Sequence, residues 1–247
     1  MAAPTMNSPP GHLLSDSGGL AYHWRALRHR HLWQPFIAHV AQWLEAWSPP
    51  QEELVIIGPS AGYTLDARFL GRFAQVIILE PDPLARALLR RRFPLVRFRH
   101  DPLDCFAGLH GPLALRQQFP QAAFLFANSI GQQLARLDSR WPAHLLSALQ
   151  DCSWASYHDV LASSRAPFTT GARLSQDGES LEQLLAAFWS GGELEVFDHG
   201  SFGVLPAAWH AAWSITPQQH HLVGWTSISV EGSSTSMLPN TGIGGRS

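Results

Sequence analysis

The sequence predicts an α/β fold, a doubly wound and mostly parallel seven-stranded sheet with a C-terminal antiparallel hairpin strand. Apolar runs alternate along the chain with stretches of helical periodicity, which is the pattern of strand–helix–strand units. The runs at 54–57 and 76–79 are apolar throughout, as in parallel strands that are buried on both faces. The turn at 217–219 is too short for a crossover helix, so the strand after it must lie antiparallel to the strand before it.

The elements follow in order along the chain. A helix over 20–47 is predicted by an apolar stripe at three- and four-residue spacing, and Pro49 and Pro50 end it. Asp82 and Pro83 start a helix after the second strand, because an acid caps it and proline suits its first position. The other predicted elements are helices through Leu65, Phe69 and Phe73 and over 179–189, and strands at 96–99, 122–127, 154–157, 194–198, 213–216 and 222–230. The segment 96–99 alternates apolar and charged residues, which favours an edge strand.

Composition and length predict one globular domain. Of the 247 residues, 45% are hydrophobic and 15% are charged, which excludes a disordered chain. We expect a flexible arm over 1–19, a single domain over 20–230 with cover helices at 20–48, and a flexible tail over 231–247. No apolar stretch approaches the roughly 20 residues that span a bilayer, so no membrane partner is predicted.

Charge and cysteine content restrict the classes of partner. The net charge of −2 gives no general attraction to nucleic acid or to an anionic membrane. The two cysteines form no Cys-x-x-Cys pair, which favours a reducing cytoplasm. The chain has no lysine, and this excludes Schiff-base chemistry and the lysine of a Walker phosphate loop.

A glycine turn follows the first predicted strand. It comprises Gly58, Pro59, Ser60, Ala61 and Gly62. Glycine lets the backbone approach a ligand closely, and the helix that follows offers unpaired N–H groups. Ligands of doubly wound sheets bind at such carboxyl ends, although an ordinary strand-to-helix turn has the same pattern.

Acids follow the next two strands. Glu80 can accept both hydroxyls of a ribose, as acids do at this place in dinucleotide folds. A helix cap is the alternative for Glu80, but Asp82 fits that role better. Asp101 can accept an amino hydrogen of adenine, or can be a turn residue before Pro102.

Polar residues also end the fourth and fifth predicted strands. Asn128 can orient a nucleophile or hold a cofactor through its amide, or can be a turn residue. Tyr157, His158 and Asp159 share this rim, where His158 can take a proton from the substrate while Asp159 holds its ring. Neighbouring side chains on a strand point in opposite directions, so His158 and Asp159 can act together only if the chain has already turned at this point. The alternative is that Asp159 caps a helix.

The histidines and the N-terminal aromatic residues are further candidates for a site. None of the 13 histidines has the spacing of His-Glu-x-x-His, and His220 and His221 would face opposite sides of a strand, so we expect no metal site. The stretch from Tyr22 to Trp33 can fold over a cofactor, or can be a cover helix with a solvated basic face.

In these features the chain resembles the class I S-adenosyl-L-methionine-dependent methyltransferases over residues 50–230. The resemblance is carried by 57–62, Glu80, Asp101, 126–129 and the terminal hairpin. It implies contacts of the turn at 58–62 with the methionine part of the cofactor, of Glu80 with ribose and of Asp101 with adenine. The chain departs from the family in having Ile56 where an acid is usual and Ser60 where a glycine is common.

The resulting prediction is a methyltransferase with S-adenosyl-L-methionine as cofactor, a small-molecule acceptor and no nucleic-acid partner. An NAD(P)-dependent oxidoreductase on the same architecture is one alternative, although it predicts Gly-x-Gly-x-x-Gly and the turn here is Gly-x-x-x-Gly. A non-catalytic module that binds a partner through its tryptophan-rich N-terminal helix is the other.

Overall fold

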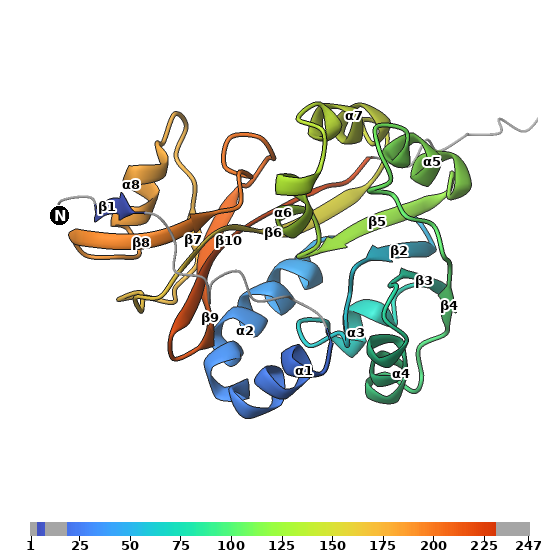
Figure 1. Ribbon diagram of the computed structural model, residues 1–247. Coiled ribbons are helices and arrows are strands. Elements are labelled where there is room, and N and C mark those ends of the chain that lie inside the picture. The colour runs from blue at the N-terminus through green and yellow to red at the C-terminus, as the bar shows by residue number, and fades with distance from the viewer. Residues whose placement is uncertain (1–3, 8–18, 231–247) are drawn as a thin grey trace, which may run out of the picture.

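The computed structural model describes residues 4–7 and 19–230, and Figure 1 shows a twisted sheet with helices on both faces. The strands are β1 (Pro4–Asn7), β2 (Glu53–Ile57), β3 (Gln75–Leu79), β4 (Phe98–His100), β5 (Ala122–Ala127), β6 (Trp154–Ser163), β7 (Arg173–Leu174), β8 (Gly192–Asp198), β9 (Trp209–Thr216) and β10 (Gln219–Ile228). The helices are α1 (Gly19–Arg28), α2 (Arg30–Ala46), α3 (Ala67–Leu70), α4 (Pro83–Arg92), α5 (Gly111–Gln118), α6 (Ile130–Gln133), α7 (Trp141–Ala148) and α8 (Leu181–Ala186), with a 3₁₀ turn at Leu134–Arg136.

The strand order confirms the predicted fold class. In the described part of the chain the order is β4-β3-β2-β5-β6-β10-β9-β7, and the first five of these strands are parallel to one another. β10 is antiparallel to β6 and to β9, as the short turn at 217–219 requires. β4 lies at the edge, as its alternating pattern predicted. The sheet has ten strands instead of seven, because β1, β7 and β8 enlarge the end formed by β6, β9 and β10.

Some elements differ in extent from the prediction. The helix expected over 20–47 is divided at His29 into α1 and α2. The strand expected over 154–157 continues to Ser163, because β10 pairs with it along this whole length. Residues 4–7 of the expected flexible arm form β1 and pair in parallel with β8. The predicted tail, 231–247, lies outside the described residues.

Apolar side chains cover the sheet on both faces. On one face Phe36 of α2 stacks on Trp213 of β9, with ring centroids 4.7 Å apart. The indole N–H of Trp33 donates to the carbonyl of Ile215 at 3.0 Å and ties α2 to the same strand. On the other face α5 and α7 pack on the sheet, and Trp141 is fully buried there. Among the described helices, none is both long and apolar enough to cross a membrane.

The order of the sheet reverses between β2 and β5. The chain passes from β2 to β3 and β4 on one side and then returns to β5 and β6 on the other. Such a reversal leaves a crevice beyond the carboxyl ends of the strands. The turn at 58–62, Glu80, Asp101 and Asn128 follow the four strands that meet at this edge.

Candidate functional site

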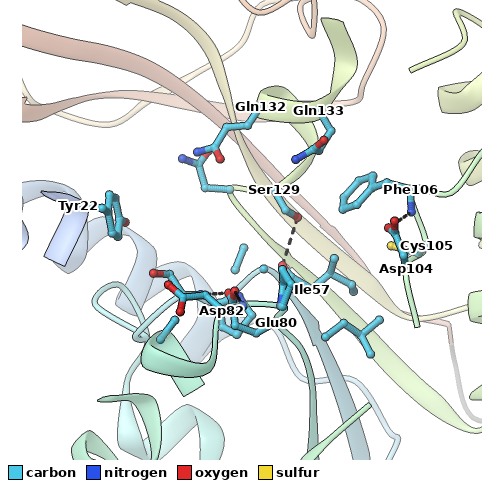
Figure 2. Close-up of a pocket in the computed structure, with 18 of the residues that line it drawn as sticks. Tyr22, Ile57, Glu80, Asp82, Asp104, Cys105, Phe106, Ser129, Gln132 and Gln133 are labelled. Atoms are coloured by element: carbon cyan, nitrogen blue, oxygen red, sulfur yellow. Dashed lines mark hydrogen bonds between the residues drawn. The ribbon is translucent and has the colours of Figure 1, made fainter. Parts of the chain in front are cut away.

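A cavity of about 480 Å³ lies at this crevice (Figure 2). Its size suits a ligand of the dimensions of a nucleotide or a drug. The predicted site residues that line it are Gly58, Pro59, Ser60, Glu80, Asp101, Asn128 and Tyr157. The predicted site residues outside its lining are Ala61, Gly62, His158 and Asp159.

The turn after β2 has a left-handed backbone at three positions. The φ angles are 66° at Gly58, 49° at Ser60 and 66° at Gly62. Ser60 therefore takes a conformation that glycine adopts more readily. The backbone of the turn is left-handed at this position although a serine stands where a glycine is common. The turn directs the N–H of Ser60 to Oε2 of Glu80, at 2.8 Å. The backbone of this turn and the carboxylate of the next strand thus form one hydrogen-bonded unit.

We expect Gly62→Ala to lower the free energy of unfolding by about 1–2 kcal/mol more than Gly108→Ala. Both glycines have nearly the same left-handed φ, 66° and 64°, so the backbone penalty is shared. A Cβ at Gly62 would lie 2.5 Å from Cδ1 of Leu89 and 2.8 Å from Phe93, whereas a Cβ at Gly108 would meet nothing within 4 Å. Urea denaturation of both variants measures the difference, and equal losses would contradict this packing.

Glu80 is held by two backbone groups at the end of β3. Its Oε2 accepts from Ser60, and its Oε1 accepts from the N–H of Asp82 at 3.0 Å. Burial raises the pKa of this carboxyl, while the two backbone N–H groups oppose the rise. Asp82 caps α4 by accepting from the N–H of Leu84 at 2.8 Å, as predicted, so Glu80 is not needed as the helix cap.

Asp101 follows β4 and lines the same cavity. Its Oδ1 accepts from the N–H of Leu103 at 3.0 Å, which is the turn interaction considered as an alternative. Its Oδ2 accepts from the side-chain amide of Gln118 at 2.9 Å. Each oxygen has a second lone pair, so the turn role does not exclude contact with a ligand.

Asn128 has a left-handed backbone, with φ 56°, directly after β5. Its Nδ2 donates to Oδ2 of Asp159 at 3.1 Å. Its Oδ1 is buried and has no hydrogen-bond partner among the described residues. Beside it, the hydroxyl of Ser129 donates to the carbonyl of Ile57 at 3.2 Å and joins the ends of β5 and β2 (Figure 2). An unpaired buried acceptor at a cavity wall is suited to a ligand N–H or O–H.

The expectation that residues 157–159 end a strand is wrong, because β6 continues to Ser163. Side chains therefore alternate through this segment, and His158 faces away from Tyr157 and Asp159. His158 is 1% exposed and its Nδ1 contacts the hydroxyl of Ser156 at 3.2 Å. The structure gives His158 no access to the cavity, so it offers no support for a proton transfer by this residue.

Asp159 is fully buried behind Asn128. Burial alone would raise the pKa of this carboxyl, but the charge of His221, 2.9 Å away, and its other neighbours lower it to about 2. A β-bulge at Val160 sets the direction of Asp159, because Leu161 pairs with Leu222 while Asp159 pairs with Val223. The bulge brings Asp159 to the face of the sheet that carries His221.

An aromatic wall closes the cavity on the side of α1. Tyr22, Tyr63, Tyr157 and Trp213 line it. The hydroxyl of Tyr157 is 2.6 Å from the hydroxyl of Thr64. Burial raises the pKa of the Tyr157 hydroxyl. In the stretch from Tyr22 to Trp33, Tyr22 reaches the cavity, while other residues form the helices α1 and α2 that cover the sheet.

Several lining residues were not predicted. They are Tyr63, Leu103, Asp104, Cys105, Phe106, Gln133 and Trp213, among others. Burial raises the pKa of the Cys105 thiol to about 12, so this cysteine is a packing residue and not a nucleophile. Asp104, Cys105 and Gln133 belong to no recognisable sequence motif. They line the cavity because the loops after β4 and β5 fold back over the sheet, and the sequence pattern does not predict how they fold.

The fold also brings together residues that the sequence did not connect. Asp159, His199 and His221, here called the His–Asp cluster, each place one potential ligand atom within 4.8 Å of the others. We expected no metal site because no two histidines had ligand spacing. The three residues come from distant parts of the chain, so spacing carries no information about them.

Comparison with known proteins gives only distant likenesses. No family model and no curated protein matches the chain. The chain is similar to the magnesium protoporphyrin IX methyltransferase of Synechocystis PCC 6803 with bound SAH (12% identity, 87% of this chain, 90% of that chain, TM-score 0.43). It is also similar to an amino pentose methyltransferase from Micromonospora echinaspora with bound SAM (20% identity, 66% of each chain, TM-score 0.33).

A third likeness is to a candidate Zn-dependent alcohol dehydrogenase from Rhodobacter sphaeroides (19% identity, 47% of this chain, TM-score 0.34). The match spans 44% of that chain, which is less than half of its length. At these identities and TM-scores, none of the likenesses assigns an activity to the chain.

Proposed function

We propose that this protein is an S-adenosyl-L-methionine-dependent methyltransferase that acts on a small-molecule acceptor. The observation that carries the proposal is the unit formed by the left-handed turn at 58–62 and the carboxylate of Glu80, joined through Ser60 at 2.8 Å. The unit lies at the reversal point of the sheet and lines the cavity. Acids at this place in nucleotide-binding sheets accept ribose hydroxyls.

The residues of the cavity suit the parts of this cofactor. Each oxygen of Glu80 accepts one backbone N–H and keeps a lone pair for a ribose hydroxyl. We assign adenine to the side of Asp101 and Phe106, and the methionine part to the turn at 58–62. Ile56 is fully buried in the core and cannot contact the cofactor amine. The unpaired Oδ1 of Asn128 is the acceptor that we assign to that amine instead.

Methyl transfer makes modest demands on acid–base chemistry. The cofactor supplies a methyl group already activated on a sulfonium, so the protein has to exclude water and hold the acceptor in line. We assign this task to the aromatic wall, which includes Tyr22, Tyr157 and Trp213, and to Gln132 and Gln133. No step requires His158.

Calorimetry with S-adenosyl-L-methionine, S-adenosyl-L-homocysteine and NAD tests the proposal. We expect binding of the two sulfur compounds and none of NAD. Binding of NAD alone would instead favour the oxidoreductase, and binding of none of the three would favour the non-catalytic module.

Glu80→Gln is expected to weaken S-adenosyl-L-methionine binding by about 1–3 kcal/mol, because an amide presents a donor where the backbone and the ribose require acceptors. Asp66→Asn is the matched control. Asp66 also accepts from two backbone N–H groups, those of Arg68 and Phe69, but it does not line the cavity. Calorimetry should therefore find that Asp66→Asn binds S-adenosyl-L-methionine with the affinity of the wild type. If Glu80→Gln also binds with wild-type affinity, the ribose is assigned to the wrong residue.

A further inference from the structure

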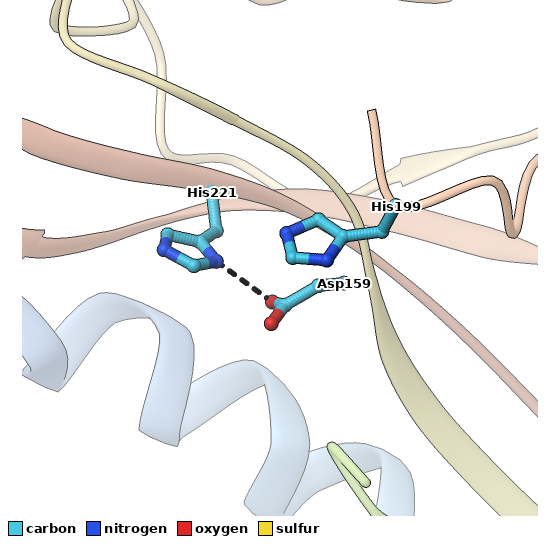
Figure 3. Close-up of side chains that lie close together, drawn as sticks. All are labelled: Asp159, His199 and His221. Atoms are coloured by element: carbon cyan, nitrogen blue, oxygen red, sulfur yellow. Dashed lines mark ion pairs between the residues drawn. The ribbon is translucent and has the colours of Figure 1, made fainter. Parts of the chain in front are cut away.

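The His–Asp cluster joins three elements of the larger end of the sheet (Figure 3). Asp159 lies on β6, His221 on β10 and His199 directly after β8. None of the three lines the cavity, so the cluster is separate from the proposed cofactor site. Asn128 is the link between them, because it lines the cavity and donates to Asp159.

The polar atoms that the cluster turns inward are unsatisfied. Oδ1 of Asp159, Nε2 of His199 and Nδ1 of His221 are buried and have no hydrogen-bond partner within the part of the chain that is described. Three such atoms side by side need an explanation, because native proteins pair nearly all of their buried polar groups. Nδ1 of His221 is 2.9 Å from Oδ1 of Asp159, which is the distance of an ion pair when the imidazole is protonated. A metal ion that takes the place of this proton would be bound by both atoms.

We propose that the His–Asp cluster binds a divalent transition-metal ion through Oδ1 of Asp159, Nε2 of His199 and Nδ1 of His221. Two imidazoles and one carboxylate are a donor set that suits Zn²⁺ and Fe²⁺, and three protein ligands leave at least one position open. The hard cations Ca²⁺ and Mg²⁺ prefer oxygen ligands and are not expected to bind here.

The remaining polar atoms of the three ligands are held by other groups. Oδ2 of Asp159 accepts from Asn128, and Nε2 of His221 is 3.1 Å from the side-chain amide of Gln219. His199 has a hydrogen bond to the backbone of Gly131, and its unpaired Nε2 leaves Nδ1 as the atom that makes it. Outer contacts of this kind orient the ligands of metal sites. The amide of Gln219 can present its oxygen to His221 when Nδ1 binds the metal, since the two ends of the amide have the same shape.

The geometry needs only a small adjustment. Metal–ligand bonds of about 2.0–2.2 Å in a tetrahedral site place neighbouring ligand atoms about 3.3–3.6 Å apart. The pair of Asp159 and His221 is slightly closer, at 2.9 Å, and the separations across the cluster reach at most 4.8 Å. His199 follows the end of β8 and is partly exposed, so it is the ligand that is free to approach. The bound metal then fixes β6, β10 and the end of β8 to one another.

Titration of the chelator-treated full-length protein with Co²⁺ and Zn²⁺ tests this proposal without any methyl donor. We expect one Co²⁺ per chain with visible absorption bands of nitrogen and oxygen coordination, a Kd of about 10 μM or tighter, and a higher melting temperature with Zn²⁺. Failure of S-adenosyl-L-methionine binding would not affect these results, so the two proposals are tested independently.

His199→Ala and Asp159→Asn should abolish the bands and weaken binding at least tenfold, and His144→Gln should not. His144 is an exposed histidine on α7 and controls for adventitious binding to surface imidazoles. Because Asp159 is buried, circular dichroism checks that its variant folds. If that variant does not fold, His199→Ala decides the result. Equal metal binding in wild type and His199→Ala, or no stoichiometric binding by wild type, would overturn the proposal.

Discussion

Lowering the pH from 6.5 to 4 is expected to destabilise the folded protein by about 3 kcal/mol for each of two buried histidines, His158 and His210. They lie on β6 and β9 and pair with the same residue of the strand between them, Gly224 of β10. Each ring contacts one serine hydroxyl through Nδ1, and each Nε2 is buried without a hydrogen-bond partner among the described residues.

The direction follows from where each state binds protons. Burial, and then the neighbouring His210, lowers the pKa of His158 from 6.5 to about 4, against the opposing effect of Asp159. Burial likewise lowers the pKa of His210 to about 4. Between pH 6.5 and 4 the unfolded chain therefore binds protons that the folded chain does not. Stability is complete above pH 6.5 and is lost as the pH falls through this window.

Urea denaturation at several pH values between 7 and 4.5 measures this loss. His158→Asn and His210→Asn keep a polar atom near the serine hydroxyl but cannot titrate, so each should make the free energy of unfolding less dependent on pH. His144→Asn is the control for replacing a histidine at an exposed position of α7. The same free energy of unfolding at pH 7 and pH 5 in the wild type would contradict the prediction.

The rim of the cavity could be predicted from the sequence because parallel strands end at one edge. Gly58, Glu80, Asp101 and Asn128 each follow an apolar run, and adjacency of the runs is enough to bring them together. Phe106 could not be predicted as a lining residue. Its place depends on how the loop after β4 packs on the sheet, which no local pattern records.

The His–Asp cluster was beyond prediction for a related reason. Asp159 was expected at the end of a strand, but β10 extends the pairing of β6 and makes it a mid-strand residue. Its direction then depends on the bulge at Val160, and the sequence around Val160 has no glycine to indicate one. The same extension places His158 within the strand and away from the rim. One error in the predicted length of β6 therefore gave a wrong position for His158 and left the contacts of Asp159 with His199 and His221 unpredicted.

Gly131→Ala is expected to destabilise the protein by about 3 kcal/mol, although alanine in an unhindered helix would stabilise it by about 1 kcal/mol. Gly131 lies in α6 directly against β6. A Cβ there would overlap the carbonyl oxygen of Asp159 and lie 2.9 Å from its backbone nitrogen. These are backbone atoms of a central strand, so the helix has to move instead of the strand. That movement would shift Gln132 in the cavity wall and would break the bond between Gly131 and His199.

Two measurements distinguish this close packing from an ordinary helix position. Urea denaturation should show a loss of stability in Gly131→Ala, and the Co²⁺ titration should show weaker binding, because His199 loses the group that orients it. Gln133→Ala is the matched control, since it changes the same short helix without adding an atom beside β6. If Gly131→Ala were more stable than the wild type, α6 would lie farther from β6 than the contact with Asp159 implies. The added methyl group would then meet no backbone atom, and only the higher helix propensity of alanine would act.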